Sequence, residues 1–569
     1  MDWTSVFDET GDEELIIPQL MEGHPTEPRI ERLLKKLYVQ ENCPNEIRGH
    51  RLMEISEIHA QTTSPSYSLK SLYYLTINYI LGVGCLGIPY AFARAGFLLC
   101  IAILLTVTSF SYMTVMWVAE TGQRYEIEKR SADKEKAAME TTSLLDSAGP
   151  LHTQDTIVLR HEVIDLVSHY LGPVHAFIYQ TSLIFLMFVG LLAYSQVFCG
   201  SISALLFCET DAPKGLSQVI FAVMVIPLSC MELDEQVSIQ SLMAKARFLA
   251  IFIMVAGSLF ALFVDDSPER LLVIAPNDHP PFWAPSEPDG CQMSYTACFT
   301  GFGVAFSTAL FSQLFQHSVP GLLRPLNDQP HLIGKAPQVF GASLLTTCSF
   351  YLLLGTSAAS YFGANTKSSV NLNFANFNFG VNPETSPAWV LSLVHVASSI
   401  VVIFPALDTI SVFPLIANTL GNNMYAASNP SFLKWIAHQM ASIQGASLHA
   451  RRRKRYSDLG LDDRKVLLQK ASQVSTIFWR LAAAVPPLIG SIWATDLSFS
   501  FLLAGVAGIY VAFVAPCLLQ LWSRATVEHV SLFRGWYSHP TWTFPVMGFA
   551  FFALCVVVAQ IGDAWRAMP

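Results

Sequence analysis

The decisive stretch of this sequence reads Asn78-Tyr-Ile-Leu-Gly82-Val-Gly84-Cys-Leu-Gly87-Ile-Pro89-Tyr-Ala91, and it lies inside a long apolar segment. Glycine and proline interrupt the segment four times, although they disfavour a helix by about 1 and 3 kcal/mol relative to alanine. A broken helix at membrane depth is tolerated only where its freed backbone groups face protein, water or a polar ligand. We therefore expect this stretch to unwind and to hold a ligand.

The composition is that of a polytopic membrane protein. Hydrophobic residues make up 52% of the 569 residues and charged residues only 14%, well apart from the usage of soluble domains. The net charge of −9 is modest, and the basic residues are dispersed or confined to loops, so a nucleic-acid partner is not expected. The first 20 residues are acidic and lack the basic and apolar regions of a signal peptide, which predicts a cytosolic N-terminus.

Eleven apolar segments are long enough to cross a bilayer, which takes about 20 residues each. The predicted fold is therefore an all-α membrane protein with eleven transmembrane helices. The segments are 70–92, 97–119, 173–206, 216–232, 243–264, 295–318, 338–362, 387–415, 474–494, 498–522 and 543–564.

The distribution of lysine and arginine predicts the orientation, since these residues concentrate on the cytosolic side. With the N-terminus inside, the basic residues left outside are Arg94, Lys214, Arg270, Lys367 and Arg566. The predicted organisation is a disordered cytosolic tail (1–69), a transmembrane domain (70–564) with flexible cytosolic loops (120–171 and 419–472), and a short extracytosolic C-terminus (565–569).

A second glycine-rich stretch, Thr300-Gly301-Phe302-Gly303-Val-Ala-Phe306-Ser307, lies in the sixth apolar segment. In a fold of two inverted five-helix halves, the sixth helix repeats the first, and interruptions in both helices indicate the binding site. Each cluster alone is also typical of a close helix-packing surface. Two clusters five crossings apart favour a LeuT-like 5+5 inverted repeat with one additional helix.

Unwinding at both places would expose amide groups and carbonyl groups, which together suit a zwitterionic amino acid. The glycines would let the substrate approach the main chain, and neighbouring side chains would shape an apolar pocket. The predicted substrate-binding residues are Gly82, Val83, Gly84, Cys85, Gly301, Phe302, Gly303 and Phe306.

Three motifs resemble the amino acid/auxin permease family. The stretch from Asn78 to Ala91 resembles the family's first helix, Phe315-Gln-His317-Ser-Val-Pro320-Gly-Leu-Leu-Arg324-Pro resembles the end of its sixth helix, and Ile403-Phe404-Pro405 resembles an element of its eighth helix. The resemblance covers about 68–564 and is similar to the sodium-coupled neutral amino acid transporters and their vacuolar and lysosomal relatives. It implies cation-coupled transport of neutral amino acids by alternating access.

The resemblance also implies an ion site. Asn78 holds the place of the family's asparagine, and Ser398 or Ser399 holds that of the hydroxyl on the eighth helix; the coupling ion is sodium or a proton. Asn78 could instead form an interhelical hydrogen bond, and the two serines could bond to their own helix. His317 and His395 are weaker candidates for proton coupling, and Tyr194 could line the pocket or simply pack.

Three further predictions concern the loops and the tail. Cys208 and Cys291 fall in predicted extracytosolic loops and could form a disulfide. Glu140, Leu144 and Leu145 match an acidic dileucine sorting signal, which together with the resemblance favours an endolysosomal membrane over the plasma membrane. The predicted partners are an amino acid, the lipid bilayer and a cytosolic protein that binds the tail.

The alternative function is an amino acid sensor, or transceptor, that signals through this tail with little flux. An enzyme is not expected, because the sequence shows no set of nucleophile and base, no metal-ligand spacing and no phosphate loop. No cofactor is expected beyond the coupling ion.

Overall fold

The computed structural model describes most of the predicted transmembrane domain. The described residues are 68–141, 161–206, 215–230, 237–264, 297–326, 330–375, 377–382, 384, 386–428, 435, 436, 439, 461–494, 496–526 and 531–567. Residues 1–67 of the predicted N-terminal tail lie outside these residues.

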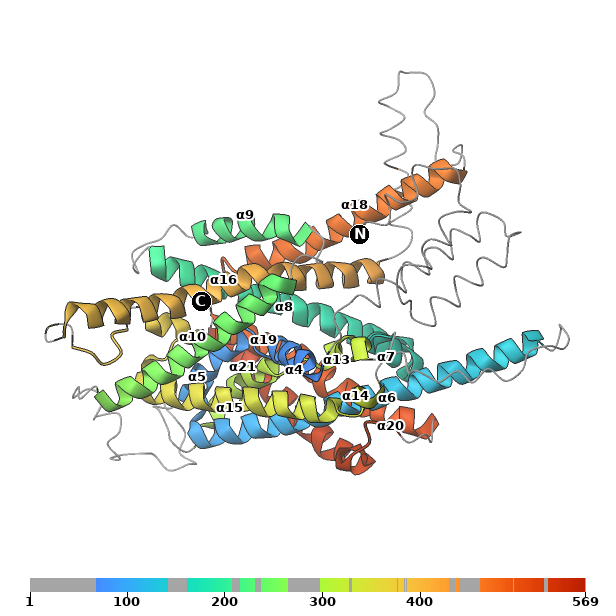
Figure 1. Cartoon of the computed structure of the whole chain (residues 1–569), viewed down its shortest axis with the longest axis horizontal. Coiled ribbons are helices and arrows are strands. Elements are labelled where there is room, and N and C mark those ends of the chain that lie inside the picture. The colour runs from blue at the N-terminus through green and yellow to red at the C-terminus, as the bar shows by residue number, and fades with distance from the viewer. Residues whose placement is uncertain are drawn as a thin grey trace, which may run out of the picture. The chain divides into compact units, whose positions relative to one another are not determined.

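Every long regular element in the described part of the chain is a helix (Figure 1). The bounds are α4 Leu69–Ile80, α5 Gly84–Ala95, α6 Phe97–Thr141, α7 Val163–Leu171, α8 Pro173–Leu206, α9 Leu216–Cys230, α10 Val237–Val264, η2 Phe299–Gly301, α12 Phe302–Ser312, η3 Gln316–Ser318, α13 Val319–Leu323, α15 Ala336–Phe362, η6 Val370–Phe374, α16 Ala388–Ala427, α18 Leu461–Gly490, α19 Leu497–Ile509, α20 Ala515–Thr526 and α21 Thr543–Ala567. Shorter helical turns join several of them.

Seven described helices are long and apolar enough to cross a membrane, and the bent pair α4 and α5 makes an eighth if it counts as one crossing. The chain is therefore an integral multi-pass membrane protein. The other predicted crossings fall on α9, which is apolar but has only 15 residues, on the short α12 and on α18.

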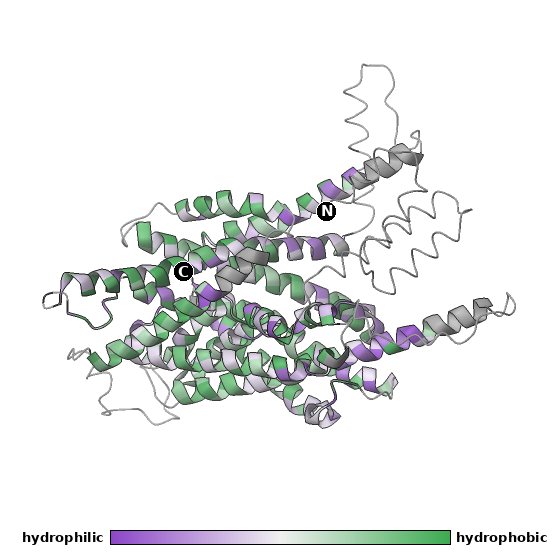
Figure 2. Cartoon of the chain, in the orientation of Figure 1, coloured by the Kyte–Doolittle hydropathy of each residue, from purple (hydrophilic) through white to green (hydrophobic). Residues whose placement is uncertain are grey.

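Hydrophilic residues gather on α6 and α18 next to the stretches drawn in grey, whereas apolar residues cover most of the other long helices (Figure 2). The second crossing was predicted to end at 119, but α6 continues to Thr141. The reason is local: residues after 119 are rich in glutamate, lysine, arginine and alanine, which favour a helix beyond the apolar region. The loop predicted as flexible also contains α7.

The first predicted break is confirmed. Helix α4 ends at Ile80, α5 begins at Gly84, and the two axes are bent by 55°. Leu81 leaves the helical conformation with φ −76° and ψ 85°. Gly87 and Pro89, which were predicted to belong to the interruption, lie within α5 instead.

The second break was predicted at Gly301 and Gly303, but it lies at the other end of α12, at Gln313. The segment from Phe302 to Ser312 is a continuous helix, and the chain leaves it at Gln313, which has φ −123° and ψ 12°. Glutamine side chains stabilise this exit, because Gln313 Nε2 donates to Thr108 Oγ1 at 2.8 Å and the Phe315 amide donates to Gln316 Oε1 at 3.0 Å. Residues 301–303 are therefore not the unwound part of the sixth segment.

Gly301 and Gly303 instead allow close packing. A Cβ on Gly301 would lie 2.4 Å from the carbonyl oxygen of Arg94 at the end of α5. A Cβ on Gly303 would lie 2.1 Å from Oε1 of Gln560 on α21. The interpretation of these glycines as a packing surface, which the sequence left open, accounts for both contacts.

Candidate functional site

The two helix breaks meet. A Cβ on Gly84, the first residue of α5, would lie 2.5 Å from the hydroxyl oxygen of Ser312, the last residue of α12. Tyr351 on α15 joins the breaks from the other side, because its hydroxyl lies 3.1 Å from the carbonyl oxygen of Ile80 and 2.9 Å from that of Ser312. One buried side chain therefore supports backbone groups at the ends of both α4 and α12.

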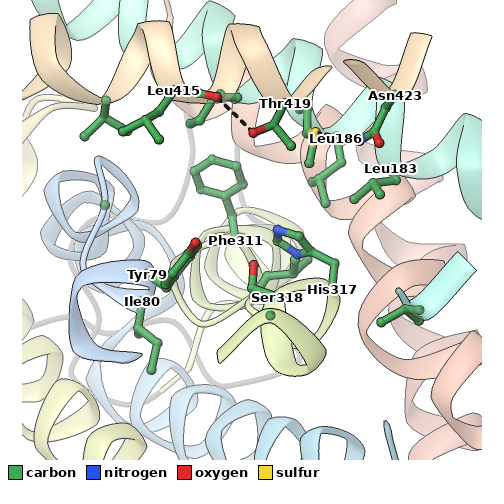
Figure 3. A pocket seen from close by; sticks show the side chains of 18 of the residues that line it. Tyr79, Ile80, Leu183, Leu186, Phe311, His317, Ser318, Leu415, Thr419 and Asn423 are labelled. Carbon is green, nitrogen blue, oxygen red and sulfur yellow. Dashed lines mark hydrogen bonds between the residues drawn. The ribbon is translucent and has the colours of Figure 1, made fainter. Parts of the chain in front are cut away.

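A cavity of about 500 Å³ opens beside these breaks, a size typical of small-molecule sites. Figure 3 shows Phe311 and His317 extending from the α12–η3 segment between Tyr79 on α4 and Leu415 on α16. Leu183 of α8 lies on a further side of the same space. Residues of α5, α7, α10 and α13 also contribute to the walls, so the cavity is formed by many separate helical segments.

The cavity lining is mainly apolar, with backbone of the first break at one end. Among the described lining residues, those with charged side chains are Glu162, Arg247 and Arg324, apart from His317. Glu162 and Arg324 are exposed, and Arg247 is paired as described below. Gly84 starts a helix of 12 residues; the amides of Cys85 and Leu86 donate to the carbonyl oxygens of Gly82 and Val83 at 3.3 and 3.1 Å, and the helix dipole favours negative charge at this end. These features suit a small polar ligand without net charge.

A buried guanidinium lies directly against the first break. Arg247 on α10 is 5% exposed, and its Nη1 donates to Asn78 Oδ1 at 2.9 Å and to the Asn78 carbonyl oxygen at 3.2 Å. The same nitrogen donates to the carbonyl oxygen of Leu81. Its Nη2 lies 2.6 Å from Oδ1 of Asp408 on α16, which is 4% exposed. The carbonyls freed by the break are thus satisfied by a side chain from α10.

This donor set does not fit a sodium ion at the predicted place. The side-chain oxygen of Asn78 and the two nearby carbonyl oxygens already accept hydrogen bonds from Arg247. Ser398 donates its hydroxyl to the carbonyl oxygen of Phe374, and it precedes Asp408 by ten residues, or about 15 Å along a helix. Ser399 is exposed on α16. The structure therefore does not bring Ser398 or Ser399 together with Asn78.

The predicted substrate residues fall into two groups. Gly82 and Gly84 line the cavity together with Asn78, while Val83 and Cys85 are buried outside the lining. The residues from the sixth segment lie elsewhere: the Phe302 ring packs 5.2 Å from Phe552 and the Phe306 ring 5.5 Å from Phe549, both on α21. Gly301, Phe302, Gly303 and Phe306 are thus packing residues between helices in this structure.

Two of the weaker candidates line the cavity. His317 does so with a buried Nδ1 that has no hydrogen-bond partner among the described residues. Tyr194 also lines it, and its hydroxyl would lie 3.0 Å from a Cβ on Gly82. His395 is exposed on α16 and outside the lining.

Several predicted residues lie outside the described part of the chain. These are Cys208, Cys291, Leu144 and Leu145, and the Glu140 side chain is not described either. Cys298, just before η2, is disulfide-bonded, and the described free cysteines are Cys85, Cys100, Cys199, Cys230, Cys348, Cys517 and Cys555. The predicted pairing of Cys208 with Cys291 and the sorting signal stay predictions.

Sequence reasoning missed Arg247, Asp408 and Tyr351. A signal for the first two was available, since an ionisable residue inside an apolar crossing is a candidate functional residue by its cost alone. Asp408 lies well inside the predicted crossing 387–415, and Arg247 lies near the start of 243–264. Nothing in the sequence marks the Tyr351 hydroxyl as the partner of two distant carbonyls.

These features define a class of protein: a helical membrane protein with a cavity at the junction of two broken helices. Residues 66–437 match the sequence profile described as "Transmembrane amino acid transporter protein". This match spans more than half of the chain, so the chain belongs to the transmembrane amino acid transporter family.

Curated relatives come from nematodes and mouse. A Caenorhabditis elegans protein named "Transmembrane protein 104 homolog" is 23% identical over 88% of this chain and 98% of its own length. The Caenorhabditis briggsae protein of the same name is 23% identical over 84% of this chain and 91% of its own length. The mouse protein "Transmembrane protein 104" is 23% identical over 61% of this chain and 72% of its own length.

Proposed function

We propose that this protein is a secondary carrier of neutral amino acids. The observation that carries the proposal is the cavity at the meeting point of the two helix breaks, where Gly84 begins α5 and Ser312 ends α12. The substrate carboxylate lies at the N-terminal amides of α5, where the helix dipole favours negative charge. The side chain occupies the apolar part of the cavity near Phe311.

A neutral side chain is favoured by the electrostatics of the lining. The charged lining residue nearest the first break, Arg247, is engaged by Asp408, and Glu162 and Arg324 are exposed. A substrate with an uncompensated charge would leave that charge desolvated, which costs several kcal/mol. A zwitterionic amino acid with a neutral side chain carries no net charge, and its carboxylate meets the positive end of the α5 dipole, which reduces this penalty.

Alternating access explains which residues line the cavity. The lining includes residues of α4, residues that follow α12 and residues of the later part of α16, which in our proposal lie toward the cytosol. At the other ends of α15 and α16 an aromatic cluster of Tyr361, Phe362, Phe374 and Phe377 fills the space, with ring centroids between 5.0 and 5.5 Å apart. In our proposal this is the inward-facing state of an eleven-helix, 5+5 inverted-repeat carrier.

Uptake by the purified full-length protein in vesicles tests the proposal. A panel of radiolabelled amino acids should show saturable uptake of neutral substrates that the Gly84→Leu variant loses while it still inserts and purifies. The matched control is Gly548→Leu on α21, where a Cβ meets nothing within 4 Å. Saturable binding without uptake would favour the sensor, and the absence of both would refute an amino acid site.

A further inference from the structure

The guanidinium of Arg247 stands where a transport cation would be expected. Three uncharged oxygens converge on its Nη1: Asn78 Oδ1, the Asn78 carbonyl and the Leu81 carbonyl. A carboxylate oxygen of Asp408 lies 2.6 Å from its Nη2. Unwound carbonyls next to a broken helix are the groups that hold sodium in carriers of this architecture. Here the same kind of oxygen set encloses a side chain of the protein.

Two properties of arginine make this occupancy permanent. The guanidinium stays protonated under all physiological conditions, so the positive charge is not removed by a change of pH. It is also attached covalently to α10, and Arg247 and its partner Asp408 are 5% and 4% exposed. A soluble cation would have to displace a charge that cannot dissociate into solution.

The guanidinium also connects three helices. Its donors reach Asn78 on α4 and Asp408 on α16, while its own backbone belongs to α10. A coupling cation bound by the carbonyls of a broken helix would supply such a link. In this chain the link is present without any ion.

We propose that Arg247 is a built-in replacement for the coupling cation, so that this carrier binds and moves its substrate without sodium. This deepens the proposed function, because it concerns the ion coupling of the same site. The sequence predicted a bound ion beside Asn78; in this proposal the guanidinium of Arg247 takes that place.

The first test is thermal unfolding of the purified full-length protein in chloride salts of sodium, potassium and N-methylglucamine at equal ionic strength. A ligand that binds only the native state raises the melting temperature. We expect the same melting temperature in all three salts for the wild type. A rise specific to sodium would overturn the proposal, and this readout does not require transport.

Variants of the guanidinium make the test sharper. Arg247→Ala leaves the oxygens of Asn78, Leu81 and Asp408 without their donor, so sodium should now raise the melting temperature more than potassium does. Arg247→Ala combined with Asp408→Asn should lose this response, and Arg247→Lys, which keeps the positive charge, should resemble the wild type. Lys245→Ala, an exposed position on the same helix, is the control.

Failure of Arg247→Ala to respond to sodium would overturn the assignment of this place as a cation site. If that variant does not fold, the wild type and Arg247→Lys still show whether sodium raises the melting temperature, and such a rise would overturn the proposal. The second test is uptake in vesicles with sodium replaced by N-methylglucamine, for which we expect a rate ratio of about one, whereas allosteric coupling between ligands typically changes affinity about 5-fold or more. Absence of uptake in both salts would refute the proposed function and leave the unfolding result standing.

Discussion

Gly84 lies so close to Ser312 that a Cβ added to the glycine would lie 2.5 Å from the serine hydroxyl oxygen and 3.0 Å from the serine Cα. The first contact could be relieved by a rotation of the side chain, but the second involves the backbone of α12. This close approach places the beginning of α5 against the end of α12, so that the two interruptions face one cavity.

Gly84→Ala should therefore impair the site even though alanine favours a helix. The added methyl group must push α5 and α12 apart, and overpacking of this kind costs about 1–3 kcal/mol. We expect a lower melting temperature and a reduced affinity for the amino acid, measured by unfolding and by ligand binding to the detergent-purified protein.

Gly548→Ala provides the control for that measurement, because it adds the same methyl group in open space on α21. Both properties should stay at the wild-type level in this variant. Normal binding by Gly84→Ala would show that the two breaks can separate without harm, and that the close approach is incidental to the site.

Tyr351→Phe should destabilise the junction of the breaks. The tyrosine is fully buried, and its hydroxyl reaches the carbonyl oxygens of Ile80 and Ser312. Its loss leaves the carbonyl oxygen of Ser312 without this donor, at about 1–3 kcal/mol, whereas the carbonyl oxygen of Ile80 also accepts from the Gly82 amide at 3.0 Å. We expect a clearly lower melting temperature together with weaker substrate binding.

The matched variant is Tyr73→Phe, which removes the hydrogen bond of 2.9 Å from Tyr73 to Thr346 between α4 and α15. Tyr73 is only partly buried, so water can replace that bond, and the effect should be smaller. Equal melting temperatures for the two variants would mean that the Tyr351 hydroxyl has no special role.

His317→Ala should raise the KM for uptake several-fold. His317 extends into the cavity in Figure 3, and its Nδ1 is buried without a hydrogen-bond partner among the described residues. A bound substrate or water could engage that nitrogen, so its removal weakens binding. His395→Ala, at an exposed position of α16, should leave the KM unchanged, and equal values for both variants would exclude a role for His317.

A second buried ion pair lies within α6 and is hydrogen-bonded to α20. Arg124 Nη2 lies 2.7 Å from Glu120 Oε2, and Gln520 Nε2 donates to the same carboxylate oxygen at 3.0 Å. Arg124→Met would leave the Glu120 carboxylate, which is 0% exposed, without its cation, and losses of this kind cost about 3–5 kcal/mol. The melting temperature should fall sharply.

The double variant Arg124→Met with Glu120→Gln removes both charges and should recover part of the lost stability. Arg566→Met disrupts the exposed pair of Arg566 and Asp563, whose atoms are 3.7 Å apart, and should have little effect. A double variant no more stable than Arg124→Met would contradict the assignment of the loss to an unpaired buried carboxylate.

The first break could be predicted from sequence because its cause is local. Gly82 and Gly84 weaken the helix where they stand, and the chain leaves the helix between Ile80 and Gly84. The second break could not be located in this way. It depends on Gln313 and Gln316, whose side chains donate to Thr108 and Thr114 on α6, and such distant partners are not visible in a glycine pattern.

The cation position illustrates the same limit. The sequence predicted an ion beside Asn78, but the group that donates to Asn78 in the structure is Arg247, which lies near the beginning of a predicted crossing, where an arginine is also typical of a cytosolic boundary. The buried position of Arg247 became evident only from the structure, in which the packing of α10 brings the guanidinium to Asn78 and Asp408. A residue's position along one crossing does not determine which neighbour it meets.

Substitutions of Gly301 and Gly303 test whether these glycines serve helix packing or substrate binding. The Cβ of Gly301→Ala would lie 2.4 Å from the carbonyl oxygen of Arg94 and 2.7 Å from Cα of Ala95, which are backbone atoms that cannot rotate away. We expect a large loss of stability. The Cβ of Gly303→Ala would meet the end of the Gln560 side chain at 2.1 Å, and a flexible side chain can adopt another rotamer.

Gly303→Ala should therefore fold, with a modest decrease in melting temperature, and its KM for amino acid uptake should equal that of the wild type. Neither glycine lines the cavity, so a methyl group at 303 has no direct contact with a substrate there. An increase in KM for Gly303→Ala at normal stability would return this glycine to the substrate site and would place the ligand beside η2 rather than beside the break at Gln313.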